Sequence, residues 1–160
     1  MNMEELAQRI QVLEDAEAIK KLKARYTNYC DNGYDPDGLA SLFVEDAVWD
    51  GGVFGKAIGR EAIRKFFRSA AKALPFALHY VMNPIIEVNG TAATGTWYLF
   101  QPCTFAEGNQ AVWGAARYQE EYVKHAGQWL FQNMKVDSAF WTPFDQGWAK
   151  KQFVQEDKAK

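Results

Sequence analysis

Residues 76–140 read FALHYVMNPIIEVNGTAATGTWYLFQPCTFAEGNQAVWGAARYQEEYVKHAGQWLFQNMKVDSAF. Four long segments rich in β-branched and aromatic residues are separated here by three turn sequences, NG at 89–90, EGN at 107–109 and HAG at 125–127. Short glycine-containing turns between such segments favour β-hairpins. Three hairpins in succession predict four antiparallel strands in a meander. Glycines at 95 and 114 predict that these strands are strongly twisted and curved.

The first half of the chain predicts helices. Apolar residues recur at helical spacing over residues 4–30, as one helix or two abutting ones, and Asn32-Gly33 ends the pattern. Asp35 or Asp37 is expected to cap a second, short helix. Residues 46–58 predict an irregular hairpin or bent strand, and residues 59–74 an amphipathic third helix.

These elements predict an α+β fold. Three N-terminal helices are expected to pack on a strongly curved, mainly antiparallel sheet and to close it into a cone-shaped α+β barrel. A length of 160 residues with 48% hydrophobic content suits one domain spanning 1–160. The tail, about 142–160, carries aromatics to position 153 and is expected to pack on the domain, with its last residues loose. The mouth of the cone is a natural small-molecule site.

The charge balance and the cysteines narrow the partners. Eighteen basic and 20 acidic residues give a net charge of −2 without a basic cluster, so neither nucleic acid nor a membrane is an expected partner. Two distant cysteines, and a beginning without the pattern of a signal peptide, predict a cytoplasmic protein with reduced thiols. We find no glycine-rich phosphate loop and no Cys/His metal cluster, so no cofactor and no metal are expected.

Two histidines occur, His79 and His125. His125 lies in a turn and is interpreted as a solvated loop residue. His79 lies within an apolar segment read as a strand, where its imidazole needs a hydrogen-bonding partner. It is either a structural histidine satisfied by that partner or a catalytic base.

Asp31 is a candidate partner for His79. The carbonyl end of a helix carries partial negative charge, so a carboxylate there is unfavourable by roughly 0.3–1 kcal/mol unless a donor compensates it. An aspartate that accepts from one imidazole nitrogen leaves the other nitrogen free to act as a base. The alternative for Asp31 is a solvated turn acid. Tyr26 lies about 140° away around an ideal helix, so it shares a cavity with Asp31 only where the helix ends or distorts; otherwise it packs in the core.

Aromatic residues supply candidate walls for a ligand site. Trp97, Leu99 and Gln101 alternate along one face of a predicted strand, where the amide of Gln101 is a candidate polar contact for a substrate. Trp49 and Tyr118 are further candidate lining residues, although aromatics at such positions also form ordinary cores.

The segments LEDAEAIKKLKARYTNYCDNGYDPDGLASLFVEDAVWDG and LHYVMNPIIEVNGTAATGTWY, separated by a helix, resemble the SnoaL-like branch of the nuclear transport factor 2-like superfamily. The resemblance covers about residues 4–141. It is strongest to a group of cofactor-independent lyases that includes bile acid 7α-dehydratase, scytalone dehydratase and hexachlorocyclohexane dehydrochlorinase. In that group an Asp at the end of the first helix and a His on the strand after the third helix form a dyad. The corresponding residues here are Asp31 and His79.

The resemblance implies a dehydratase or related elimination on a hydrophobic cyclic or aromatic molecule. His79, Asp31 and Tyr26 would be catalytic, and Trp49 would line the pocket. Isomerase, cyclase or retro-aldol chemistry would use the same base, and the fold also serves non-catalytic ligand-binding and oxygenase-accessory modules. The related lyases imply a homotrimer, with a dimer across the sheet as the alternative.

Two features of the group are absent. The second carboxylate of the bile acid dehydratase is replaced by the region around Gln101. Tyr26 stands where the dehydrochlorinases have a Lys, and the region around Met134 stands where they have an Arg.

Overall fold

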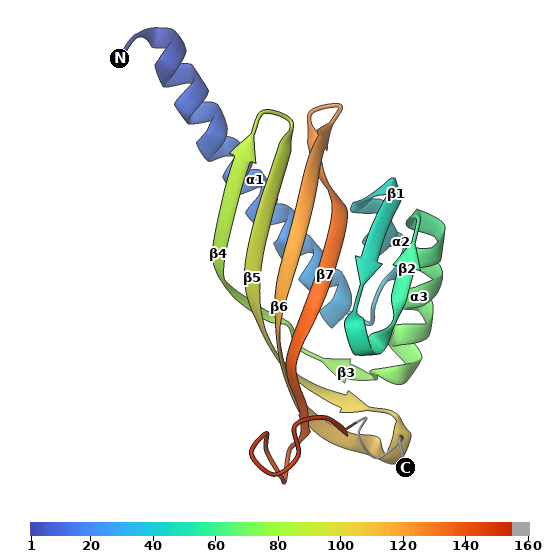
Figure 1. The fold of residues 1–160 in the computed structure, drawn as a ribbon. Helices are drawn as coiled ribbons and strands as arrows, with labels where there is room; N and C mark the ends of the chain where they lie inside the picture. Colours follow the sequence, from blue (N-terminus) through green and yellow to red (C-terminus); the bar gives the residue numbers. More distant parts are fainter. Residues whose placement is uncertain (155–160) are drawn as a thin grey trace.

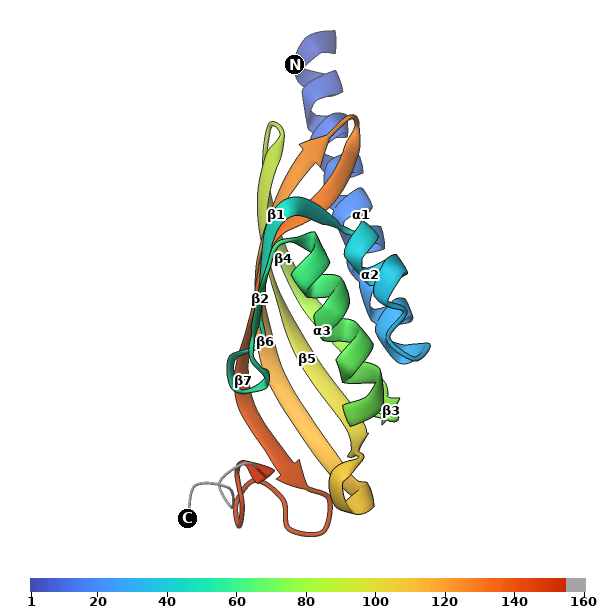
Figure 2. The same ribbon diagram turned by 90° about the vertical axis from the view of Figure 1, so that its right-hand side faces the viewer.

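The computed structural model describes residues 1–154, so the prediction that the last charged residues are loose falls outside the described part of the chain. Helices α1, α2 and α3 lie on one face of a curved sheet, whose long strands run side by side (Figures 1 and 2). The sheet and the helices together form the predicted α+β half-barrel, so the fold class is confirmed. The core fills the space between the helices and the concave face of the sheet.

Helix α1 (Met3–Asp31) is one unbroken helix. Its start is fixed by a reciprocal pair, in which the Asn2 side chain accepts from the Glu5 backbone N–H and the Glu5 carboxylate accepts from the Asn2 backbone N–H. Its second half buries the apolar stripe that includes Ile19, Leu22 and Tyr26. This burial anchors the half of the helix that ends at Asp31.

Both of the shorter predicted helices are present. Helix α2 (Pro36–Ser41) is capped by Asp35, whose carboxylate accepts from the backbone N–H groups of the first turn. Helix α3 (Arg60–Ala73) buries Ile63 and Phe67. Between them, β1 (Phe43–Asp50), the 3₁₀ turn η1 (Gly52–Phe54) and β2 (Lys56–Ile58) form the predicted irregular hairpin.

The described residues form a seven-stranded sheet in the order β2-β1-β7-β6-β5-β3, with β4 also paired to β5. Strands β4 to β7 make the predicted antiparallel meander. Strand β1 pairs in parallel with β7, so the sheet is mixed. The remaining bounds are β3 (Phe76–Ala77), β4 (Tyr80–Asn89), β5 (Ala92–Phe105), the 3₁₀ turn η2 (Glu107–Asn109), β6 (Gln110–His125) and β7 (Gln128–Pro143).

Turn and strand geometry explain the curvature. At the β6–β7 turn, Ala126 and Gly127 have φ of 48° and 78°, the two successive positive values of a type I′ hairpin. Register shifts in the β6–β7 pairing lie between Ala115 and Ala116 and between Glu121 and Tyr122. A Cβ at Gly95 would lie 2.7 Å from the Tyr122 hydroxyl oxygen, so the glycine permits this close packing on the concave face.

The prediction of one continuous strand around His79 is wrong. Strand β3 ends at Ala77 and β4 begins at Tyr80, which leaves Leu78 and His79 between strands. Leu78 donates its N–H to the Pro102 carbonyl at 3.1 Å. Because Pro102 has no N–H, it cannot return the second ladder bond to Leu78, and the ladder is interrupted beside His79.

The segment after β7 turns back onto the end of that strand. Trp141 and Phe153 form an isolated bridge, and the Trp141 N–H donates to the Gln152 carbonyl at 3.0 Å. The Thr142 hydroxyl donates to the Lys151 carbonyl at 2.6 Å. Val154 thereby reaches the rim of the cavity described next.

Candidate active site

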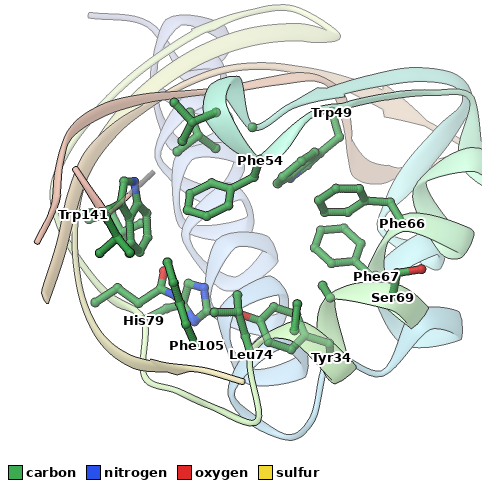
Figure 3. Close-up of a pocket in the computed structure, with 18 of the residues that line it drawn as sticks. Tyr34, Trp49, Phe54, Phe66, Phe67, Ser69, Leu74, His79, Phe105 and Trp141 are labelled. Atoms are coloured by element: carbon green, nitrogen blue, oxygen red, sulfur yellow. The ribbon is translucent and has the colours of Figure 1, made fainter. Parts of the chain in front are cut away.

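A cavity of about 820 Å³ lies between α3 and the concave face of the sheet. Its walls are mainly apolar and aromatic. Figure 3 shows His79 and Trp141 on the side of the cavity opposite Phe66 and Phe67. The lining includes Tyr26, Tyr34, Trp49, Phe54, Phe66, Phe67, His79, Leu99, Gln101, Phe105, Tyr118, Trp141 and Val154.

His79 and Asp31 are in direct contact. Oδ1 of Asp31 lies 2.7 Å from Nδ1 of His79, and the same oxygen accepts the backbone N–H of His79 at 2.9 Å. A carboxylate can only accept, so Nδ1 carries the hydrogen, and in the neutral imidazole the lone pair is on Nε2. The side chain of His79 is 6% exposed and that of Asp31 is 25% exposed. The two donors compensate the carboxylate at the carbonyl end of α1.

The position of His79 between the two strands explains this contact. Leu78 directs its N–H toward β5, so the N–H of the next residue, His79, points to the other side, where Asp31 accepts it. One residue of α1 thus fixes both the backbone and the ring of His79.

Tyr26 reaches the cavity from a different face of α1 than Asp31. The helix continues without distortion through both residues, so they do not share a face. The Tyr26 hydroxyl oxygen accepts a hydrogen bond from Nε1 of Trp49 at 3.1 Å. Burial raises the pKa of Tyr26 well above its ordinary value, so the hydroxyl keeps its proton.

Gln101 is buried at 3% exposure and lines the cavity. Within residues 1–154, the interaction found for its amide is with the Tyr34 hydroxyl. A buried amide can make up to four hydrogen bonds, so part of its capacity is left for a ligand. Leu99 and Tyr118 also line the cavity, as expected from the sequence.

Trp97 does not line this cavity, although it shares a face of β5 with Leu99 and Gln101. Its Nε1 donates to the Tyr122 hydroxyl at 3.0 Å. That hydroxyl donates to Glu120, which pairs with Lys23, and both side chains of the ion pair are fully buried. Burial lowers the pKa of Lys23, and the positive charge of its ammonium is compensated by Glu120. Trp97 is therefore part of a buried polar network near the site.

Sequence reasoning missed Tyr34. This residue follows Gly33 in the turn after α1 and has a φ of 55°, which is uncommon for a bulky side chain. Its ring stacks on Phe67 with centroids 6.1 Å apart and meets His79 edge-on at 6.0 Å. Burial raises the pKa of Tyr34 well above its ordinary value. The sequence did offer one indication of this role, because a large aromatic residue is unusual in a turn made of Asp, Gly and Pro residues.

Most of the aromatic wall was also missed. Phe54, Phe105 and Trp141 come from three separate elements, and their rings contact one another in edge-on or stacked pairs. Trp49 packs against Phe66 with centroids 4.3 Å apart. Spacing along the sequence does not show that these residues converge on one cavity.

The SnoaL-like domain family matches residues 11–135, which is most of the chain. The chain belongs to the SnoaL-like family. The match includes α2, α3, Asp31 and His79, together with β1 to β6 and the first part of β7.

Solved structures show the same fold. A hexachlorocyclohexane dehydrochlorinase, LinA type 2, is 25% identical with a TM-score of 0.77, over 82% of this chain and 90% of that one. A protein assigned as an aromatic ring hydroxylase from Novosphingobium aromaticivorans is 25% identical with a TM-score of 0.76, over 82% of this chain and 94% of that one. A scytalone dehydratase-like protein from Novosphingobium aromaticivorans DSM 12444 is 24% identical with a TM-score of 0.75, over 82% of this chain and 89% of that one.

Two negative findings concern residues 1–154. No group of three or more His, Cys, Asp or Glu side chains in this part of the chain is arranged to hold a metal ion. No helix among the same residues is long and apolar enough to cross a membrane.

Proposed function

We propose that this SnoaL-like protein is a lyase that uses His79 as a general base on a hydrophobic cyclic or aromatic molecule. The observation that carries the proposal is the fixed imidazole of His79, held by Asp31 at 2.7 Å, on the wall of an aromatic cavity of about 820 Å³. The structural similarity to a hexachlorocyclohexane dehydrochlorinase and to a scytalone dehydratase-like protein supports an elimination.

In the proposed reaction, Nε2 of His79 removes a proton from a carbon atom of the substrate. The C–H electron pair forms a carbon–carbon double bond while the leaving group departs from the neighbouring carbon with its own bonding pair. Asp31 stabilises the imidazolium that results, because its carboxylate holds Nδ1–H. General base catalysis of this kind contributes typically about 10²–10⁴-fold.

Tyr26 is the proposed donor to the leaving group or to a developing oxygen charge. Its hydroxyl oxygen accepts from Trp49, and its own hydrogen, which the Tyr118 hydroxyl and the Cys30 thiol can also accept, would turn to the ligand. Its raised pKa keeps that hydrogen in place. A departing hydroxide that takes the Tyr26 proton leaves as water, and the proton held by His79 then restores Tyr26 by way of solvent. A departing halide leaves with its bonding pair, and the proton on His79 is then released to solvent.

Tyr34 and Gln101 are the proposed polar contacts for the substrate. Together they carry three polar hydrogens, of which one is used in their mutual bond, so the pair has donors to spare. Within the described residues, no Lys or Arg lines the cavity. An uncharged ligand with an acceptor oxygen or halogen fits this lining better than a carboxylate or a phosphate. Trp49, Leu99 and Tyr118 would contact its apolar surface.

Isomerase, cyclase or retro-aldol chemistry remains the alternative for the same base, because each begins with the same proton transfer. A non-catalytic ligand-binding or oxygenase-accessory module is the alternative from another class. The similarity to a protein assigned as an aromatic ring hydroxylase favours testing it. A module that only binds has no need of a base fixed by a carboxylate.

The test measures the proton transfer separately from the elimination. Hexachlorocyclohexane, scytalone and simple cyclic ketones are the probes, incubated with the protein in D₂O and followed by NMR. The wild type is expected to exchange or eliminate an acidic C–H of at least one probe. His79→Ala should abolish this, whereas His125→Ala is the matched control at the β6–β7 turn. Equal rates in the His79→Ala variant would rule out the assigned base, and probe binding without exchange in the wild type would favour the binding module.

A further inference from the structure

The beginning of α1 extends beyond the sheet. Residues 3–14, called here the N-terminal arm, project past the ends of the long strands (Figures 1 and 2). The hydrogen bonds from α1 to the sheet begin at Asp15, which accepts from Lys124 and Trp129 at 2.8 Å each. The arm is therefore a helical extension of an element that is anchored farther along.

The arm carries an apolar stripe. Met3, Leu6, Ile10 and Leu13 follow one another at intervals of three, four and three residues. Met3, Ile10 and Leu13 are 80%, 46% and 69% exposed. At about 100° per residue, these side chains lie on one side of the helix.

This stripe points away from the body of the same chain. The residues of α1 that pack on the sheet, such as Ile19, Leu22 and Tyr26, lie on the opposite side of the helix. The chain cannot cover the stripe with its own sheet. Exposed apolar side chains in a continuous row mark an interaction surface.

The spacing of the apolar residues in the arm indicates that its partner is another helix. In heptad terms, Met3 and Ile10 occupy a positions, and Leu6 and Leu13 occupy d positions. Ile at a with Leu at d favours two parallel strands. Arg9 and Glu14 then fall at g and e, the positions that meet between helices in a parallel, in-register pair. The charges of Arg9 and Glu14 are opposite, so two copies of this arm complement each other.

We propose that the N-terminal arm pairs with the arm of a second copy of this chain as a short parallel coiled coil. Arg9 of each copy faces Glu14 of the other, and the four apolar residues form the seam. The bodies lie on the outer sides of the two helices, because each packs on the face opposite its stripe.

The arm is prepared for this contact. An isolated helix of this length would be marginal in water, but here the helix is nucleated by the anchored turns after Asp15. Little ordering is then required on association. The family match begins at residue 11, so most of the arm lies outside the matched residues. The pairing is independent of the function proposed for His79.

The first experiment measures association of the full chain by sedimentation equilibrium. Ile10→Glu should raise the dimer dissociation constant at least tenfold. Arg9→Glu and Glu14→Arg should each weaken association, because each places like charges opposite one another, and the double exchange should restore it. The two positions lie about 140° apart on one helix, so restoration reports a contact between copies. Thermal unfolding checks that every variant remains folded.

A second experiment fixes the direction of the pair. Under oxidation, Leu6→Cys should form a disulfide between copies, because a d position meets itself in a parallel register. Gln8→Cys, exposed on the other side of the arm, is the control and should remain unlinked. The native Cys30 and Cys103 are buried and do not compete.

Three results would overturn the proposal. One is association that is unchanged by Ile10→Glu, as expected if copies meet through the outer face of the sheet, where Tyr80 and Phe100 are 53% and 36% exposed. The others are a monomeric wild type at all concentrations, and equal cross-linking of Leu6→Cys and Gln8→Cys.

Discussion

The carboxylate of Asp31, the last residue of α1, accepts two hydrogen bonds from His79, one from the backbone N–H at 2.9 Å and one from Nδ1 at 2.7 Å. A single oxygen therefore fixes both the position of the chain and the tautomer of the ring. The two contacts have different consequences when Asp31 is changed.

Asp31→Asn and Asp31→Ala should separate catalysis from stability. Asn keeps an acceptor for the backbone N–H but lacks the charge that stabilises an imidazolium, so turnover should fall roughly 10²–10⁴-fold with stability nearly unchanged. Ala also leaves buried donors unpaired, which should cost about 1–3 kcal/mol of unfolding free energy. The effect on catalysis is measured as turnover of the probe on which the wild type is active. The effect on stability is measured by urea denaturation. Full activity of Asp31→Asn would contradict the role of the dyad.

Gln101→Leu should weaken ligand binding at a modest cost in stability. The amide is 3% exposed and bonds the Tyr34 hydroxyl, so an apolar replacement leaves that hydroxyl without its partner and should cost about 1–3 kcal/mol of unfolding free energy. The dissociation constant of an oxygen-bearing probe should rise about tenfold, as for the loss of one hydrogen bond. Quenching of tryptophan fluorescence can follow binding, since Trp49 and Trp141 line the cavity. A purely apolar probe is the control and should bind at least as well as to the wild type.

Asp15 should make stability depend on pH below about 4. Burial raises the pKa of Asp15, but hydrogen bonds from Lys124 and Trp129, with the charge of Lys124, outweigh it and leave the pKa lowered. The ionised carboxylate of Asp15 therefore adds to the unfolding free energy. This stabilisation is fully present above the pKa of Asp15 in the unfolded chain, and it is lost as the pH falls through the lower pKa of the folded protein. Asp15→Ala should cost roughly 1–3 kcal/mol at pH 7 because Trp129 loses its acceptor. Urea denaturation curves between pH 3 and 7 should give an unfolding free energy that depends less on pH in Asp15→Ala than in the wild type.

The two thiols should be unreactive in the native state. Burial raises the pKa of Cys103 to about 12 and that of Cys30 further, so little thiolate is present at pH 8. A chromogenic disulfide reagent should label neither thiol at pH 8 until denaturant is added, after which both react. Rapid labelling of folded protein would show that one of the two sites opens.

Much of the fold could be read from local patterns. The periodicity of Ile19, Leu22 and Tyr26 set the buried face of α1, and the turns at 89–90, 107–109 and 125–127 set the meander, because turn geometry and side-chain alternation are local properties. The parallel pairing of β1 with β7 was not predictable in this way. It joins segments far apart in the sequence and leaves no local pattern.

The same distinction between local patterns and long-range contacts holds for the candidate site. The sequence by itself determined that a carboxylate stands at a helix end and that an imidazole stands among apolar residues, so both need partners. Only the tertiary structure decided that they meet, because it brings the end of α1 beside the segment between β3 and β4, where the His79 N–H points away from β5 and toward Asp31. It also decided that Tyr34, and not Trp97, lines the cavity, because strand curvature sets which residues of one face share a pocket.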